Sequence, residues 1–341
     1  MTTPEGGQCR KRAGIAAGVL AVLTLTAALL SPGQSAALDP YPDLGNCPVF
    51  PDPPPGLSPT APSLPTEAAW NQDVSRAPLA PGSAATIAYI DTHGGDRLHP
   101  DFGSPRAYGF PYAAIGAGQP KLPIHYAAYG EESDPGPFPI PSNAPVEGGA
   151  RSDGDRHVLV VDRSTCTLYE LYRAFFQRGG NPHWNADSGA RWDLRSAARR
   201  PDSWTSADAA GLPIFPGLLR YDEVAAGRVD HAIRVTFEST RDAWLHPASH
   251  CAGDTADPRA PAMGTRLRLK RSYGIGGFHG AARVIADALK RYGLIVADNG
   301  SNWFFGGTSD RRWDDEDLDQ LKRIPGSAFE VAKSAARIHA C

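Results

Sequence analysis

Several stretches in the second half of the chain alternate apolar and polar residues, the pattern of a β-strand with one buried face. In residues 233–238, three apolar side chains would face a core while the residues between them point the other way. Residues 266–270 repeat this alternation with two leucines. Residues 157–161, four of them consecutive apolar residues at 158–161, are typical of a strand buried on both faces, and residues 166–172 follow as a return strand.

A helical pattern lies closer to the C-terminus. Its apolar positions recur at intervals of three and four residues, at Ala281, Val284, Ile285, Ala288, Leu289 and Tyr292. Gly293 is a residue type at which helices commonly end. Residues 294–298 then predict a strand, and the Asn-Gly pair at 299–300 predicts a hairpin turn to a return strand at 301–305. A second, short helix is predicted at 314–323, where acidic residues come first and basic residues last.

The composition agrees with a strand-rich protein. The 341 residues include 36 glycines and 32 prolines, a high share for a helical fold. No helix of crossover length alternates with the predicted strands, which argues against a parallel βαβ sheet. The sequence therefore predicts an α+β, β-rich fold with antiparallel sheets, sandwich-like or jelly-roll-like, and two or three packed helices.

The first 37 residues have the features of an export signal. A basic group at 10–12 precedes an uncharged apolar run at 13–30, and small residues before position 38 supply a cleavage site. An uncleaved membrane anchor is the alternative, because this run is at the short limit for spanning a bilayer. We expect cleavage and a secreted protein without stable membrane insertion. A proline-rich linker at 38–65 and a single β-rich globular domain at 66–341 would follow.

Removal of the signal would leave an even number of cysteines, which in an exported protein indicates two disulfides. These cysteines are Cys47, Cys166, Cys251 and Cys341. They allow three pairings, of which we favour Cys166–Cys251 within the globule and Cys47–Cys341 between its ends. The chain has no C-x-x-C pair, so a structural zinc site is not expected.

Charge and motifs exclude several classes of function. The formal net charge is -3 and no stripe of basic residues exists to neutralise phosphates, so we expect no nucleic-acid partner. The sequence contains no GxSxG elbow, HExxH pair or Walker A loop, and no GxGxxG between a predicted strand and a helix. We therefore predict no bound cofactor.

Acidic residues beside aromatic residues are the main candidates for chemistry. Glycoside hydrolysis needs two carboxyl groups flanking the bond, one of them kept protonated, and aromatic rings that stack on sugars. The candidate catalytic carboxylates are Glu170, Asp193, Asp208, Glu223 and Asp298. The candidate substrate-binding side chains are Trp192, Trp204 and Trp303. For each acid, a helix cap or a salt bridge to a nearby arginine (Arg195, Arg220 or Arg234) is the structural alternative.

Histidines offer a weaker, metal-dependent alternative. His93, His99 and Asp101 lie close together in the sequence, after a predicted strand at 87–90. Imidazole beside carboxylate suits a metal site or an acid–base pair, although a polar surface loop also explains the composition. His246 and His250 would share one face of a helix, but the proline between them favours a loop.

Three segments, at 155–162, 204–214 and 296–300, resemble a group of exported bacterial proteins without an assigned activity. The resemblance implies a single secreted globule and supplies no site residues.

These observations lead to three hypotheses of function. The first is a secreted carbohydrate-active enzyme, a polysaccharide hydrolase or lyase that uses a carboxylate pair. The alternative is a non-catalytic protein that binds polysaccharide or cell-wall glycan through the same tryptophans. A metal-dependent hydrolase is a third, weaker hypothesis. A cleft that holds two carboxylates would favour catalysis, whereas a flat aromatic strip would favour binding.

Overall fold

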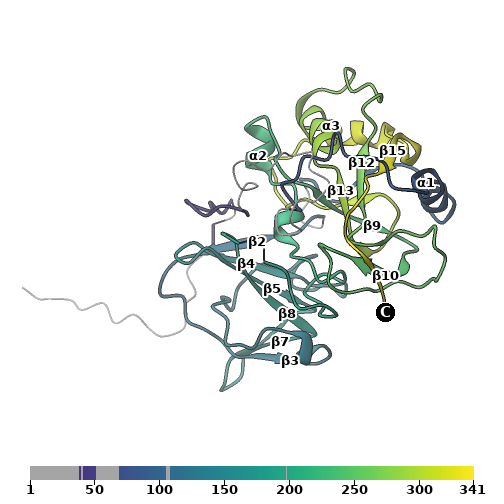
Figure 1. The fold of residues 1–341 in the computed structure, drawn as a ribbon. Helices are drawn as coiled ribbons and strands as arrows, with labels where there is room; N and C mark the ends of the chain where they lie inside the picture. Colours follow the sequence, from purple (N-terminus) through teal and green to yellow (C-terminus); the bar gives the residue numbers. More distant parts are fainter. Residues whose placement is uncertain (1–37, 40, 51–68, 105–107, 197) are drawn as a thin grey trace, which may run out of the picture. The chain divides into compact units, whose positions relative to one another are not determined.

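The computed structural model describes residues 38–39, 41–50, 69–104, 108–196 and 198–341. The predicted signal at 1–37 and much of the predicted linker lie outside these residues. In the described part, strands predominate over helices, so the predicted β-rich α+β class is confirmed (Figure 1). Within these ranges, no helix combines the length and apolar character needed to cross a bilayer.

The largest sheet contributes to the largest hydrophobic core. Its strands, in order across the sheet, are β1 (His99–Pro100), β14 (Phe304–Phe305), β9 (Ile233–Phe237), β13 (Leu294–Asn299), β12 (Arg266–Leu269) and β15 (Phe329–Val331). β9 and β13 run parallel, whereas β12 runs antiparallel to both β13 and β15. The apolar positions of β9 that the alternation predicts, such as Val235 and Phe237, are fully buried in this core.

Three smaller sheets complete the described part. One has the order β2 (Tyr112–Ile115), β4 (Val158–Asp162), β5 (Thr167–Tyr172) and β8 (Ser188–Asp193). A second has the order β3 (Ile124–Tyr126), β7 (His183–Ala186) and β6 (Phe175–Gln177). A third has the order β11 (Ala262–Met263), β10 (Arg241–Leu245) and β16 (Ile338–Ala340). The strands β4, β5 and β8 lie side by side in teal in Figure 1.

The prediction of antiparallel sheets is wrong. Each of the four described sheets combines parallel and antiparallel neighbours. β2 and β4, for example, are parallel, and the chain between them also forms β3. A parallel pair needs only a connection long enough to return the chain to the same end of the sheet. Here long irregular segments supply that connection, so the absence of crossover helices was no guide to strand direction.

Helix α3 (Gly280–Arg291) confirms the predicted apolar stripe. It buries Ile285, Ala288 and Leu289 in the largest core and packs against β12. The second predicted helix is present as α4 (Asp315–Asp319), which continues into a 3-10 turn at Gln320–Arg323.

Two further helices were not predicted. Helix α1 (Ser83–Thr92) packs against β15. It includes residues 87–90, which were predicted to form a strand. The mixture of β-branched and aromatic residues there suited either structure, and burial of Ile87 and Ile90 in the largest core decided it. Helix α2 (Tyr221–Ala225) is a short turn of five residues.

The predicted hairpin at 294–305 does not form. The two strands exist as β13 and β14, but β9 lies between them, parallel to β13 and antiparallel to β14. The Asn-Gly segment therefore carries the chain across the end of β9. Asn302 stabilises this crossing, because its Oδ1 accepts a hydrogen bond from the backbone N–H of Glu238 at 2.8 Å.

The four predicted disulfide cysteines are paired, but not in the favoured way. The disulfides are Cys47–Cys166 and Cys251–Cys341. Cys166 follows the turn between β4 and β5, and Arg163 in that turn donates a hydrogen bond to the carbonyl oxygen of Asp43. Residues 41–50, within the predicted linker, are thereby tied to the sheet. In the second disulfide, Cys341 directly follows β16, which pairs with β10. The spacing of the cysteines along the chain does not reveal these tertiary neighbours.

Candidate functional site

Arg234 lies at the centre of the candidate site. Its neighbours Ile233 and Val235 enter the largest core, so the alternation of β9 directs Arg234 to the opposite face. The Arg234 side chain is only 6% exposed. Its guanidinium donates two hydrogen bonds to Asp208, from Nε to Oδ2 at 3.1 Å and from Nη2 to Oδ1 at 2.6 Å. The ring of Phe110 covers the guanidinium at 5.1 Å.

Asp208 holds this arginine in place. It is buried, and its backbone N–H donates to the hydroxyl oxygen of Ser206 at 2.9 Å. Both of its carboxylate oxygens accept from Arg234. This geometry is the salt bridge that the sequence offers as the structural alternative to catalysis. A carboxylate without a face toward solvent can position Arg234, but it has no path to a polymer.

Glu147 and His157 form a second charged pair. His157 immediately precedes β4 and is buried. Its Nδ1 lies 2.5 Å from Oε2 of Glu147, and its Nε2 lies 2.9 Å from the carbonyl oxygen of Ala207. Because both ring nitrogens face acceptors, the imidazolium form is favoured. Burial acts to lower the pKa of His157, but the Glu147 carboxylate outweighs it and raises that pKa to about 9.

The pKa of Glu147 moves in the opposite direction. Burial acts to raise it, but the charge of His157 and hydrogen bonds to it, with a further effect of Arg234, lower it below the ordinary value. The Glu147 side chain is 25% exposed. Glu147 therefore presents an ionised carboxylate to solvent.

Asp298 is a carboxyl group whose pKa is shifted in the direction opposite to that of Glu147. It stands near the end of β13, directly after an irregularity in the pairing with β9 that begins at Val296. Its Oδ2 lies 3.5 Å from Nη2 of Arg234, and its side chain is 24% exposed. Burial, together with the negative charge of Asp208, raises the pKa of Asp298 to about 7. Asp298 therefore keeps a proton under conditions in which Glu147 is ionised.

Asp101 adds a third accessible carboxyl group. It follows β1, and its backbone N–H donates to the carbonyl oxygen of Phe305 at 3.0 Å. Burial raises the pKa of Asp101, with Arg234 opposing and Glu147 reinforcing the shift. We refer to these charged residues as the Arg234 cluster, which consists of Asp101, Glu147, His157, Asp208, Arg234 and Asp298.

The pairing of His157 with Glu147 predicts a specific pH dependence of stability. A histidine with a folded pKa above its ordinary 6.5 contributes stability that is complete below pH 6.5 and is lost as the pH rises through about 9. We therefore expect the unfolding temperature Tm to fall between these two pH values and His157→Gln to flatten the slope. Asp298 and Glu170 also lose their protons at about 7 in the folded protein, so the two slopes are compared between about pH 8 and 9, above those transitions. Equal slopes in both proteins, measured by calorimetry, would contradict the pairing.

Glu170 is fully buried in the middle of β5. Its carboxylate accepts hydrogen bonds from the backbone N–H groups of Ile214 and Phe215 at 3.0 and 2.9 Å, and from Nε1 of Trp192 at 3.0 Å. Burial raises the pKa of Glu170 to about 7. Such a carboxylate joins the strand to the 214–215 segment, and the structure places it away from solvent.

The other two predicted acids lie outside the Arg234 cluster. Asp193 is exposed and accepts a hydrogen bond from Nε of Arg195 at 2.9 Å, which lowers its pKa. Glu223 belongs to the first turn of α2 and accepts from the backbone N–H of Arg220 at 2.8 Å. Its carboxylate also lies 3.1 Å from Nε2 of His231. These contacts are the salt-bridge and capping alternatives that the sequence offers.

The three predicted tryptophans are divided between a pocket and the core. Trp192 and Trp204 line a pocket of about 250 Å³, where the guanidinium of Arg200 lies 5.6 and 5.3 Å from their rings. Trp303 is fully buried, and its Nε1 donates to Asp91 at 2.9 Å. The structure therefore gives Trp192 and Trp204 a shared concave surface, whereas Trp303 packs inside.

The three residues proposed for a metal site each make different contacts in the structure. His93 ends helix α1 and stacks on Tyr89 with ring centroids 3.8 Å apart, whereas His99 stacks on Phe304. Asp101 belongs to the Arg234 cluster, where it interacts electrostatically with Arg234 and Glu147. Among the described residues, these three do not form a group with the ligand spacing of a metal site.

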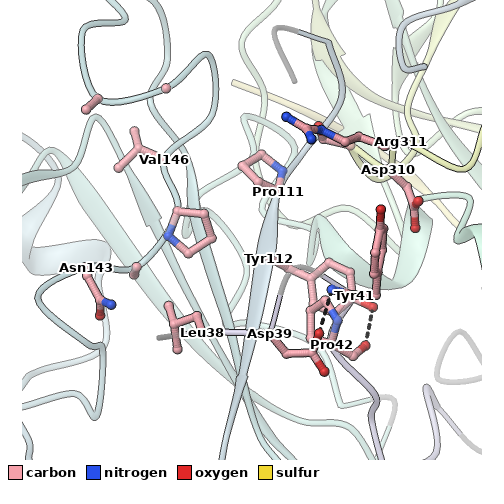
Figure 2. Close-up of a pocket in the computed structure, with 15 residues that line it drawn as sticks. Leu38, Asp39, Tyr41, Pro42, Pro111, Tyr112, Asn143, Val146, Asp310 and Arg311 are labelled. Carbon is pink, nitrogen blue, oxygen red and sulfur yellow. Dashed lines mark hydrogen bonds between the residues drawn. The ribbon is translucent and has the colours of Figure 1, made fainter. Parts of the chain in front are cut away.

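The residues that line a cavity of about 440 Å³ include two sequence neighbours of residues in or beside the Arg234 cluster. Its lining includes Val146, next to Glu147, and Pro111, next to Phe110. Figure 2 shows Tyr41 beside Tyr112, with Asp310 and Arg311 on the same side of the cavity. The hydroxyl of Tyr112 donates to the carbonyl oxygen of Pro42 at 2.8 Å, which fixes the position of its ring. Aromatic rings beside charged groups characterise this wall.

Sequence reasoning missed Glu147 and His157 as site residues and assigned Arg234 only a salt-bridge role. Glu147 stands in a Pro- and Gly-rich stretch that breaks every periodic pattern, so no predicted element indicated its direction. A signal was present in β9, where alternation points Arg234 away from the apolar face. Arginine in the centre of a buried strand requires carboxylate partners.

No protein family, curated protein or solved structure matches this chain.

Proposed function

We propose that the protein is a carbohydrate-active enzyme that cleaves glycosidic bonds of a polysaccharide, with Asp298 as the acid and Glu147 as the base. One observation carries the proposal: two accessible carboxyl groups around one buried arginine have pKa values shifted in opposite directions. Such a split is how enzymes assign an acid and a base to two carboxyl groups. It is also the requirement of glycoside hydrolysis.

The proposed chemistry assigns one role to each group. Asp298, protonated below about pH 7, donates its proton to the glycosidic oxygen as the bond to the leaving sugar breaks. Glu147, ionised through its contact with His157, takes a proton from the attacking water in a hydrolase, or from a sugar carbon in a lyase. Burial and the charge of Asp208 raise the pKa of Asp298, whereas the charge of His157 lowers the pKa of Glu147, and these opposite effects keep the two groups apart in proton affinity.

Features outside the cluster support a polysaccharide as substrate. The cavity whose lining includes Val146 and Pro111 combines Tyr41 and Tyr112 with charged side chains, a mixture suited to sugar rings and their hydroxyl groups (Figure 2). The two disulfides are typical of proteins that fold in an oxidising compartment. They support the proposal of a secreted protein, as do the features predicted for residues 1–37.

A second candidate function is polysaccharide binding without catalysis. The pocket lined by Trp192 and Trp204 supports it, because aromatic walls on a concave surface can hold sugar rings. The guanidinium of Arg200 lies close to both rings and donates hydrogen bonds to Asp134 and to the carbonyl oxygen of Glu132 at 2.7 and 2.6 Å, so it helps to fix this aromatic wall.

The two functions are separated by one screen of the purified protein against plant and microbial wall polysaccharides. Binding, release of reducing ends and formation of unsaturated uronates are measured in parallel. We expect product from at least one polymer. Binding without product would overturn the enzyme proposal and leave the second candidate, and a protein that neither binds nor cleaves any polymer would overturn both.

A further inference from the structure

A second group of chemically competent side chains shares no residue with the Arg234 cluster. Asp202, His246 and His339 each offer one ligand atom, and these atoms lie within 4.8 Å of one another. They come from three separate segments: a loop, the residue after β10, and the middle of β16. The fold therefore assembles two imidazoles and one carboxylate that are far apart in the sequence.

The orientation of His246 suits a ligand. Its Nδ1 lies 3.2 Å from the carbonyl oxygen of Ala248 and also contacts Nη1 of Arg199. With a metal ion on Nε2, the ring would carry its proton on Nδ1 and donate it to the Ala248 carbonyl oxygen. That Nε2 lies 3.8 Å from Oδ1 of Asp202. Two ligands of a tetrahedral ion with bonds of about 2.0–2.1 Å stand roughly 3.4 Å apart, so a small shift of these side chains is sufficient.

His339 is held in place by its neighbours. β16 pairs antiparallel with β10, which sets His339 opposite Trp244. The two rings stack with centroids 4.1 Å apart and planes 6° from parallel. The disulfide Cys251–Cys341 fastens the chain two residues further on. This end of the chain therefore has a fixed position, which is what a ligand on a terminal strand needs.

A positive charge already occupies the space beside these groups. Nη1 of Arg199 lies 2.8 Å from Nε2 of His246 and 3.6 Å from Oδ1 of Asp202. The environment thus accepts a cation. The Arg199 side chain is 30% exposed, so it can swing into solvent when another cation takes its place.

We propose that Asp202, His246 and His339 form a binding site for a divalent transition-metal ion of the zinc type, with water in the remaining coordination positions. Two imidazoles select ions such as Zn²⁺ over Mg²⁺ and Ca²⁺, which prefer oxygen ligands. The site is independent of the carboxylate pair proposed for catalysis, because no residue is shared.

Titration calorimetry of the purified, untagged protein with Zn²⁺ tests the site. We expect one ion per chain, and at least about tenfold weaker binding in His246→Ala and in His339→Ala. His250→Ala is the matched control, because this histidine lies on the same loop but contacts the carbonyl oxygen of Ala209 at 2.9 Å instead. The His250→Ala protein should bind Zn²⁺ with the same affinity as the unaltered protein. Titration of the unaltered protein with Ca²⁺ or Mg²⁺ should give no binding heat.

Arg199→Ala supplies a second test that does not depend on removing a ligand. Loss of the competing guanidinium should tighten Zn²⁺ binding about tenfold. If the protein does not bind Zn²⁺ at a concentration of about 0.1 mM, which is well above the dissociation constants of structural zinc sites, the proposal is wrong. Binding that persists unchanged in both histidine variants would overturn it equally.

Discussion

Replacing Asp298 with asparagine is expected to reduce the turnover of the polysaccharide substrate by about two to four orders of magnitude. An amide has no proton to give to the glycosidic oxygen, whereas Asp298 keeps its proton up to about pH 7. Rates of product formation under saturating polymer measure the effect. Asp287→Asn is the matched control, since Asp287 is an exposed carboxylate of α3 paired with Arg283.

The pH profile separates loss of the acid from a general disturbance. In the unaltered protein, activity should decline as the pH rises through about 7, where Asp298 loses its proton. On the acid side, activity should decline below the ordinary pKa of a glutamate, where Glu147 takes up a proton. Asp298→Asn should lose the alkaline decline. An Asp298→Asn enzyme with the same rate and the same profile would exclude Asp298 as the acid.

Replacing Arg234 with methionine is expected to destabilise the protein by about 3–5 kcal/mol. The substitution leaves the carboxylate of Asp208 buried at 1% exposure without its two hydrogen bonds from the guanidinium. An uncompensated buried charge is far more costly than the loss of one surface ion pair. The free energy of unfolding, measured by urea denaturation, gives the effect.

A double substitution tests whether the buried charge is the cause. Arg234→Met together with Asp208→Leu removes both charges, so most of the lost stability should return. If Arg234→Met alone costs less than about 1 kcal/mol, the guanidinium does not compensate the carboxylates around it. The assignment of Arg234 as the partner that compensates the buried Asp208 would then be wrong.

The sequence was sufficient to predict elements with a strong local period. The alternation in β9 and the apolar stripe of α3 identified both elements and their buried faces. The Asn-Gly turn misled, because a turn signal reports local backbone preference and cannot exclude insertion of a distant strand. β9 is far from β13 in the sequence, and its place between β13 and β14 is fixed by burial of Val235 and Phe237.

The candidate site was only partly predictable for the same reason. Asp298 was selected because it ends a predicted strand, and it does lie in the Arg234 cluster. Glu147 and Asp101 lie in irregular segments, where no periodicity shows which way a side chain points. Glu170 and Asp193 were also selected as acids beside aromatic residues, yet burial of Glu170 and the local arginine pairing of Asp193 give them different surroundings. Tertiary contacts made that distinction.

The most direct test of the account is a titration of the carboxyl groups by ¹³C NMR, with Asp298→Asn and Glu147→Gln used to assign the two resonances. We expect Asp298 to titrate at about 7 and Glu147 below the ordinary glutamate value. Glu147 should rise toward that value in His157→Gln. Two carboxyl groups that titrate together near their ordinary values would contradict the acid–base assignment and, with it, the proposed catalytic role of the Arg234 cluster.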